Sequence, residues 1–317
     1  MSNLVFVALS TFAVDDQRPL DALKSSGYPF QIYGSGKRIT KAELLLHAKD
    51  ATVILAGVEP YDQETLAQLP NLRCISRCGV GVDAIDLKTA GRQGVTVANT
   101  PGIPTDAVAE LALAMFLDLS RSLHMQANLM HKKRWERLTA HLLSGRTVGL
   151  IGLGNIGRRV AQLCQAFNAK VIAFDPMTDA GVARELGISL VHKQQLLSEA
   201  DIVSLHASKT VGQSVLIGAA ELKAMKRGAV LVNLARGEMV DELALVDALK
   251  SGQISGAGLD VFGAEPYTGP LCEFDQVILT PHSATNTIET RSAMELQCVE
   301  NALHFLDGKL MSKYRVI

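Results

Sequence analysis

The feature that most constrains the fold is the segment 147–161, where an apolar run is followed by closely spaced glycines and then by a helical pattern. Gly152, Gly154 and Gly157 form the pattern G-x-G-x-x-G between the predicted strand and the predicted helix. The first glycine allows a tight turn, the second lets a pyrophosphate approach the backbone, and the third lets the helix pack on the strand. This unit predicts a parallel α/β sheet of the Rossmann type that binds a dinucleotide.

The next predicted strand, 170–174, ends at Asp175, which lies 175 − 152 = 23 positions beyond the first glycine. An acid at this place is expected to bind the ribose hydroxyls of the adenosine. The free N–H groups of Asn155 and Ile156, at the start of the helix, are expected to bind the phosphates. The alternative is a glycine-tolerant turn without a ligand. This alternative is disfavoured because the strand, the helix and the acid after the next strand all lie where the dinucleotide-binding fingerprint requires them.

Three polar side chains follow further apolar runs near the end of the chain. The runs predict parallel strands at 229–233, 256–261 and 277–280. Arg236, Glu265 and His282 come after them, and parallel strands deliver their carboxyl ends to one edge of the sheet. Singly, Arg236 could equally pair with Glu238 or Asp241, and His282 could be an ordinary loop histidine. Together at three strand ends, they suit binding a carboxylate and moving a proton.

Length and pattern predict two domains. A chain of 317 residues is long for one hydrophobic core. Short strands and helices alternate before residue 99, a proline- and glycine-rich linker follows, and a second βα series extends to residue 280. Helical spacing over 286–307 would return the chain to the first domain. The expected domains are 1–101 with 286–317, for the substrate, and 102–285, for the dinucleotide.

Composition excludes several classes of partner. The formal net charge is −1, which argues against binding to nucleic acid or to a membrane surface. A basic cluster at 131–137 is interpreted as a solvated face. Five scattered cysteines without a C-x-x-C pair indicate free thiols in a reducing compartment. No apolar stretch reaches membrane-spanning length, and the first residues lack the basic region of a signal peptide, so a cytoplasmic location is expected.

Several segments together resemble one protein family. Besides the glycine fingerprint and Phe-Asp-Pro at 174–176, they are SRCGVGVDAID (76–86), NTPG (99–102), TDAVAELAL (105–113), LVNLARGEMVD (231–241), GAGLDVFGAEP (256–266) and ILTPHSA (278–284). The sequence resembles the D-2-hydroxyacid dehydrogenases, a family that includes phosphoglycerate dehydrogenases and glyoxylate and hydroxypyruvate reductases. The resemblance implies an α/β fold, with a Rossmann-type domain and a discontinuous flavodoxin-like substrate domain. It also implies NAD as cofactor and a small 2-hydroxy or 2-oxo acid as substrate.

The resemblance also implies the roles of individual residues. Arg236 would hold the substrate carboxylate and carbonyl oxygen, His282 would exchange the proton, and Glu265 would orient the histidine and favour the imidazolium. The backbone amides of Val80 and Gly81 would bind the substrate carboxylate. The expected cofactor contacts are Val108, Gly152, Gly154, Asn155, Ile156, Asp175, Thr210, Ala235, Asp260 and His282. No metal is expected. Because no basic residue follows Asp175 directly, NAD is favoured over NADP.

The identity of the substrate stays open. Phosphoglycerate dehydrogenases typically carry an arginine just after the third strand, whereas this chain has Ala56 and Gly57 there, with Glu59 following. That difference favours a small acid such as glyoxylate or hydroxypyruvate over 3-phosphoglycerate. Arg77 could still supply positive charge, as could basic residues 132–137 of a second subunit. D-3-phosphoglycerate dehydrogenase therefore remains the alternative.

Two other classes of protein share the predicted fold. Corepressors of transcription can bind the dinucleotide as a signal, and formate-type dehydrogenases replace the acid that Glu265 supplies here. The enzyme is favoured over both. Finally, a helix predicted at 107–120 is apolar nearly all round, which suits burial between domains or subunits and predicts a homodimer.

Overall fold

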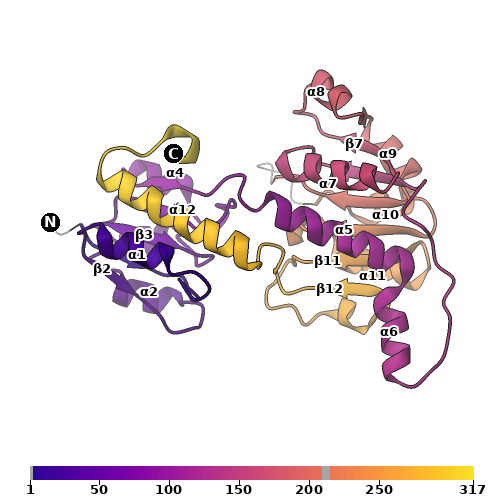
Figure 1. Ribbon diagram of the computed structural model, residues 1–317, viewed down its shortest axis with the longest axis horizontal. Helices are drawn as coiled ribbons and strands as arrows, with labels where there is room; N and C mark the ends of the chain where they lie inside the picture. The colour runs from indigo at the N-terminus through magenta and orange to yellow at the C-terminus, as the bar shows by residue number, and fades with distance from the viewer. Residues whose placement is uncertain (1–2, 209–214) are drawn as a thin grey trace. The chain divides into compact units, whose positions relative to one another are not determined.

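The computed structural model describes residues 3–208 and 215–317 (Figure 1). The chain divides into two compact units, 1–104 with 286–317 and 105–285. From the sequence, the first boundary was expected after residue 101, three residues before the division after residue 104. The second boundary was expected after residue 285, where the division lies. Each unit is built around its own parallel sheet with helices on both faces.

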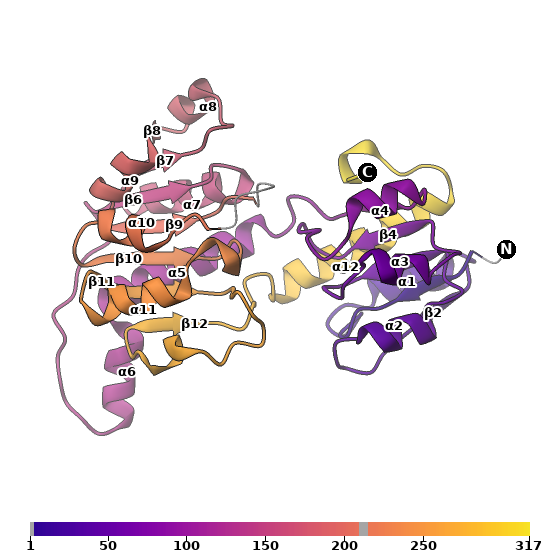
Figure 2. The same cartoon turned by 180° about the vertical axis from the view of Figure 1, so that it is seen from behind.

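The first unit has the strand order β2-β1-β3-β4-β5, which is the flavodoxin-type order. Its strands are β1 (Val5–Val7), β2 (Phe30–Ile32), β3 (Val53–Ala56), β4 (Cys74–Arg77) and β5 (Thr96–Ala98). Its helices are α1 (Arg18–Ser25), α2 (Lys41–His47), α3 (Gln63–Ala67), α4 (Leu87–Arg92), α12 (Ile288–Leu306) and the 3-10 helix η3 (Ser312–Tyr314). Alternate strand residues point to opposite faces. One face packs against α1 and α12, and the other against α2, α3 and α4 (Figure 2).

The second unit has the strand order β12-β11-β10-β9-β6-β7-β8. Its strands are β6 (Thr147–Ile151), β7 (Lys170–Phe174), β8 (Ser189–Leu190), β9 (Ile202–Leu205), β10 (Ala229–Asn233), β11 (Ile254–Leu259) and β12 (Val277–Leu279). Its helices are α5 (Thr105–Arg121), α6 (Leu123–His131), α7 (Asn155–Ala166), α8 (Ala180–Glu185), α9 (Lys193–Glu199), α10 (Ala219–Ala224), α11 (Glu242–Lys250) and the 3-10 helices η1 (Gly237–Met239) and η2 (Pro270–Glu273). From β6 the chain continues to β7 and β8 on one side of the sheet and then to β9 and the later strands on the other side. Such sheets bind dinucleotides at this point, between β6 and β9. The expected fold class is confirmed.

The apolar helix α5 is buried within the second unit. Its buried residues include Ala112, Met115 and Phe116, and it packs against α7, β10 and β11. Burial in this core accounts for much of its apolar character without a second subunit. Among the described residues, no helix has both the length and the apolar character needed to cross a membrane. The five cysteines are free thiols, and all except Cys272 are buried.

Candidate active site

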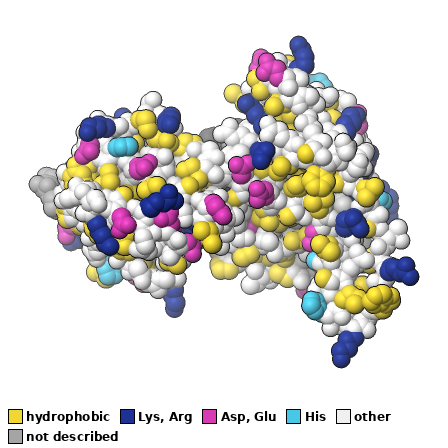
Figure 3. All heavy atoms as spheres, viewed as in Figure 1, with side chains coloured by type: hydrophobic (Ala, Val, Ile, Leu, Met, Phe, Trp, Pro, Cys, Tyr) yellow, Lys and Arg dark blue, Asp and Glu magenta, His cyan; other side chains and the backbone are white. Residues whose placement is uncertain are grey.

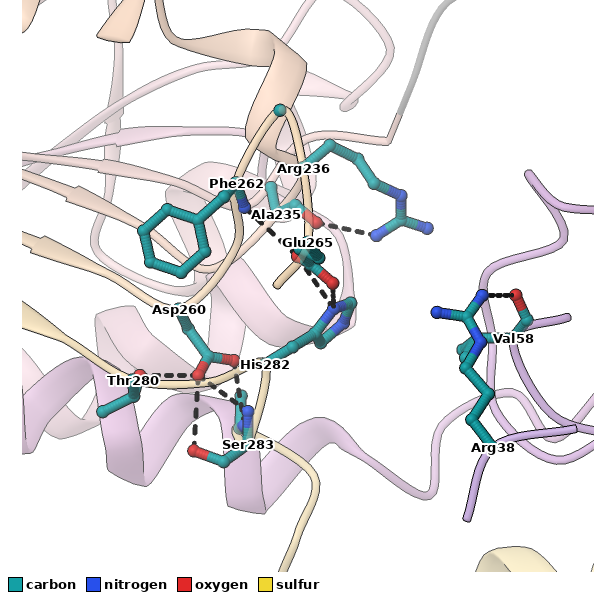
Figure 4. Close-up of polar contacts among 12 residues, drawn as sticks. Arg38, Val58, Ala235, Arg236, Asp260, Phe262, Glu265, Thr280, His282 and Ser283 are labelled. Atoms are coloured by element: carbon teal, nitrogen blue, oxygen red, sulfur yellow. Dashed lines mark hydrogen bonds and ion pairs between the residues drawn. The ribbon is translucent and has the colours of Figure 1, made fainter. Parts of the chain in front are cut away.

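A histidine and a glutamate face each other at the carboxyl edge of the second sheet. His282 follows β12 and Glu265 follows the adjacent strand β11. The histidine Nδ1 lies 2.9 Å from Oε2 and 3.2 Å from Oε1 of the glutamate (Figure 4). Since a carboxylate only accepts hydrogen bonds, Nδ1 carries a proton in this pair, and Nε2 is left to exchange one. The His282 side chain is 50% exposed, so a substrate can reach it.

The loop that carries His282 is fixed by a buried acid. Asp260, only 1% exposed, accepts hydrogen bonds from Thr280 Oγ1 (2.6 Å) and Ser283 N (2.8 Å) at Oδ1, and from Ala284 N (2.9 Å) at Oδ2. His282 has a φ of 51°, in the left-handed region, which costs a non-glycine residue about 1–3 kcal/mol. These hydrogen bonds hold the loop in that conformation. We therefore assign Asp260 to positioning the histidine, and its expected contact with the nicotinamide stays a prediction.

Arg236 lies on a turn that a buried asparagine holds. Asn233 ends β10, is 1% exposed, accepts a hydrogen bond from Ala235 N (3.0 Å) and donates one to Arg236 O (2.8 Å). The Arg236 guanidinium donates to Ala235 O at 2.7 Å. Asn233 was not among the site residues expected from the sequence. The available signal was a polar residue at the end of an otherwise apolar strand.

The Arg236 turn packs directly on the loop that carries Glu265. A Cβ added to Gly237 would lie 1.9 Å from the carbonyl carbon of Phe262, so only glycine fits. Phe262 N in turn donates to Glu265 Oε1 at 3.2 Å. The second unit thus brings Arg236, Glu265 and His282 together, as the sequence predicted (Figure 4). A guanidinium, an imidazole and a carboxylate at one sheet edge can bind an anionic substrate and transfer a proton to it.

The glycine loop after β6 fits a dinucleotide pyrophosphate. Added Cβ atoms would lie 2.6 Å from Ala207 N at Gly152 and 2.2 Å from Gly152 O at Gly157, so both must be glycine. At Gly154, an added Cβ would meet no described atom within 4 Å, which leaves the backbone open to a ligand. The helix α7 begins at Asn155 without a side-chain cap, so its first N–H groups are available to an anion.

Asp175 is tied to the same glycine loop. Its Oδ2 accepts a hydrogen bond from Leu153 N (2.7 Å), and its Oδ1 accepts from Met177 N (2.7 Å) and Thr178 N (3.2 Å). Burial raises the pKa of this carboxyl, but the backbone hydrogen bonds outweigh burial and hold the pKa below its usual value. The resulting negative charge suits ribose hydroxyls and repels a 2′-phosphate.

The other expected residues are spread over both units. Val108 and Ala235 are buried in the second unit, at 5% and 7% exposure. Thr210 lies outside the described residues. Val80 and Gly81 belong to the first unit, on the loop after β4, where Val80 is 45% exposed. The ligand contacts expected for these residues stay predictions.

Comparisons with known proteins agree with this geometry. Residues 113–284 match the model of the NAD-binding domain of the D-isomer specific 2-hydroxyacid dehydrogenases. The chain is 35% identical over 280 residues to a glyoxylate reductase of Korarchaeum cryptofilum, covering 86% of this chain and 84% of that protein. It is 38% identical over 275 residues to a D-3-phosphoglycerate dehydrogenase of Mycobacterium leprae, covering 86% of this chain but only 52% of that protein.

A similarity to a solved structure of a 2-hydroxyacid dehydrogenase agrees with these matches. D-Lactate dehydrogenase of Aquifex aeolicus, complexed with NAD and lactic acid, matches with a TM-score of 0.87 and 30% identity over 99% of both chains. The family model and the relatives together establish both the cofactor and the reaction class. The chain therefore belongs to the D-isomer specific 2-hydroxyacid dehydrogenases, which are NAD-dependent oxidoreductases.

Proposed function

We propose that this protein interconverts a small 2-oxo acid, of the glyoxylate or hydroxypyruvate type, and the corresponding 2-hydroxy acid. The observation that carries the proposal is the contact of His282 Nδ1 with Glu265 Oε2, at 2.9 Å, on the strand edge that also presents Arg236. When bound, NAD(H) accepts or supplies the hydride. The protein supplies the anion site and the proton.

Each side chain has a defined task in this proposal. Arg236 binds the substrate carboxylate and polarises the 2-oxo group, because its planar guanidinium offers two parallel donors. The amides of Val80 and Gly81 bind the carboxylate as well. His282 donates its Nε2 proton to the carbonyl oxygen during reduction and takes the proton back during oxidation. Glu265 keeps the imidazole oriented and stabilises its charged form.

A panel of 2-oxo acids tests the proposal. The absorbance of reduced nicotinamide should fall when glyoxylate or hydroxypyruvate is added to the protein with NADH. Tight dinucleotide binding without turnover of any 2-oxo acid would contradict the proposal. That result would instead favour a dinucleotide-sensing protein of the corepressor type.

D-3-Phosphoglycerate dehydrogenase activity is the alternative. Its substrate reacts at the same carbon and differs by a phosphate on C3. Both activities occur among the relatives of this chain. Ala56, the last residue of β3, supports the unphosphorylated acid. The exposed Arg38, which donates a hydrogen bond to Val58 O on the loop after β3, supports the phosphorylated one.

We also propose a homodimer formed by the second unit. Large apolar side chains are exposed on α6 and on the segment that follows it: Leu123 (62%), Met130 (52%), Trp135 (80%) and Leu142 (68%). Hydrophobic side chains lie among Lys and Arg side chains over this part of the molecule (Figure 3). Exposed apolar patches of this kind mark protein–protein contacts. Sedimentation at micromolar concentration should give about twice 34.0 kDa, and a 34.0 kDa species would refute the dimer.

We further propose a cytoplasmic location, with no nucleic-acid or membrane partner. The support is five free thiols, four of them buried, which suit a reducing compartment. The near-neutral net charge of −1 also gives no electrostatic drive towards polyanions. Cell fractionation that found the protein with membranes would contradict this proposal.

A further inference from the structure

We infer that Cys78 and Cys298 are a peroxide-sensitive thiol pair, and that a hydroperoxide converts them into a disulfide that weakens substrate binding. Both residues belong to the first unit, where Cys78 directly follows β4 and Cys298 lies on α12. The formation of the disulfide rests on contacts within this unit alone. Its effect on activity rests on the proposed function, in which the amides of Val80 and Gly81 bind the substrate carboxylate.

The fold places the two thiols side by side. β4 and α12 pack against each other (Figure 2). On β4, the Ser76 hydroxyl donates to Cys298 O at 2.7 Å, and the Cys298 thiol donates to Ser76 O at 3.1 Å. The bond from Cys78 N to Ala56 O (2.9 Å) continues the ladder of β3 and β4, so Cys78 faces α12 as Ser76 does. The Cys78 and Cys298 thiols are hydrogen-bonded to each other.

The two thiols differ in how easily they ionise. Buried thiols are usually inert, because burial disfavours the thiolate that reacts with oxidants. At Cys78, the hydrogen bond from Cys298 outweighs burial and holds the pKa of the thiol below its usual value. The positive charges of Arg77 and Arg291 act in the same direction, and the negative charge of Glu295 opposes them. Burial raises the pKa of Cys298, so Cys78 is the nucleophile of the pair.

Cys78 is also the member of the pair that lies nearer to solvent. It is 7% exposed, whereas Cys298 is fully buried. The loop that starts at Cys78 reaches the surface within two residues, since Val80 is 45% exposed. A small hydroperoxide such as hydrogen peroxide therefore meets Cys78 first, and Cys298 reacts only afterwards.

Oxidation of the pair proceeds in two steps. The Cys78 thiolate attacks one oxygen of hydrogen peroxide, so that an S–O bond forms, the O–O bond breaks, and the departing hydroxide leaves as water with the proton of the Cys78 thiol. The Cys298 sulfur then attacks the sulfenic acid on Cys78. The S–S bond forms, the S–O bond breaks, and a second water leaves with the proton of Cys298. Two thiols lose two electrons in total, and the peroxide is reduced to two molecules of water.

The disulfide changes the loop 79–81, which begins directly after Cys78. In the thiol form, Arg77 Nε donates to Gly81 O at 3.1 Å and supports this loop. A disulfide holds its sulfur atoms about 2.05 Å apart, closer than two hydrogen-bonded thiols, so it pulls Cys78 towards α12. The amides of the loop then move away from the substrate carboxylate. KM for the 2-oxo acid should rise, while NADH binding at the glycine loop of the second unit should stay unchanged.

The test treats the full-length protein with hydrogen peroxide and maps its peptides, without reduction, by mass spectrometry. The peptide that contains Cys78 should be linked to the peptide that contains Cys298, with the loss of two hydrogen atoms, and dithiothreitol should separate them. The treated protein should have a KM for glyoxylate raised by about tenfold or more, with the Kd for NADH little changed. Dithiothreitol should restore the KM.

Variants separate this pair from the other thiols. Cys298→Ala and Cys298→Ser cannot form the link, so they should be active before treatment and should keep their KM after it. The matched control Cys272→Ser removes the exposed thiol and should respond to peroxide as wild type does.

Three outcomes would overturn the inference. They are the absence of the linked peptides from treated wild type, an unchanged KM in the linked protein, or an equal rise of KM in the treated Cys298 variants. Each of these leaves the proposed reaction standing. If reduced wild type turns over no 2-oxo acid, the proposed function fails and the effect on KM fails with it. The peptide map still decides, without any activity, whether the disulfide forms.

Discussion

The two units hold their candidate site groups in different ways. In the second unit, the reactive side chains are tied to each other. Glu265 contacts His282, and Asp260 holds Thr280 before that histidine and Ser283 and Ala284 after it. In the first unit, the candidate groups are backbone amides and an arginine held by one carbonyl. Rigid support suits proton transfer, which needs fixed geometry. An arginine that one backbone carbonyl holds suits recognition of an anion that differs between substrates.

From this contrast we propose that the second unit carries the chemistry and that the first unit sets the choice of substrate. It predicts that changes in the second unit lower turnover for all substrates alike. Changes at the carboxyl edge of the first sheet should instead change the ratio between substrates. The following predictions test or sharpen this division.

The largest expected effect is that of removing the proton donor. His282→Ala should lower kcat by on the order of 100-fold or more, the scale of general acid–base catalysis. The Kd for NADH should change little, since the glycine loop and Asp175 are untouched. Steady-state kinetics with fluorescence titration of NADH measure both quantities. Near-normal kcat would show that another group transfers the proton.

The next largest effect is expected from changing Asp260, which supports the loop that carries His282. The Asp260 carboxylate accepts four hydrogen bonds. Asp260→Asn replaces one of its oxygens by an N–H₂ group that faces donors, which leaves buried groups unsatisfied. We expect kcat to fall by about tenfold for every substrate, with the Kd for NADH little changed. A large rise in that Kd, with kcat preserved, would instead support the nicotinamide contact that the sequence suggested.

A smaller effect is expected at the adenosine end. Wild type should have a higher kcat/KM with NAD than with NADP, because the Asp175 carboxylate repels a 2′-phosphate. Asp175→Ala should lower kcat/KM with NAD by about fivefold, as expected for lost hydrogen bonds, and should narrow the gap between the cofactors. A wild-type preference for NADP would contradict the assignment.

The smallest effect concerns stability in acid. His206, after β9, has its Nε2 2.9 Å from Ser204 Oγ, while its buried Nδ1 has no partner among the described residues. Burial lowers the pKa of His206 from 6.5 to about 4. Between these values the unfolded chain binds a proton that the folded chain does not, so stability falls as pH drops from 6.5 towards 4.

Replacing His206 isolates this contribution. His206→Gln keeps a polar group near Ser204 but does not titrate, so its melting temperature should fall less than that of wild type between pH 7 and pH 5. Differential scanning calorimetry at both pH values measures the difference. An equal fall in both proteins would show that His206 does not cause the acid sensitivity.

Much of the fold and the chemistry could be predicted from the sequence. Apolar strands, glycines with fixed spacing and polar residues after strand ends are local signals, and parallel topology then brings Arg236, Glu265 and His282 together. The supporting contacts could not be predicted in this way. Asn233 and Thr280 look like ordinary polar residues at the ends of strands until the loops around them are placed.

The limit of what the sequence can predict is clearer in the first unit. Arg38 and Val58 are separated by 20 positions and share no motif, so their contact depends on tertiary structure. Glu59 would ordinarily be expected at the surface, because a charged side chain is seldom fully buried. Its burial with Tyr61 depends on the packing of the loop after β3. These contacts of the first unit were therefore harder to predict than the reaction class.

The most direct test of the division between the units is the ratio of kcat/KM for phosphorylated and unphosphorylated hydroxypyruvate, measured in wild type, His282→Ala and Arg38→Ala. We predict that the ratio stays within about twofold of wild type in His282→Ala, although both rates fall about 100-fold or more. In Arg38→Ala the ratio should fall about tenfold or more. A ratio that changes with His282, or that does not change with Arg38, would contradict the account.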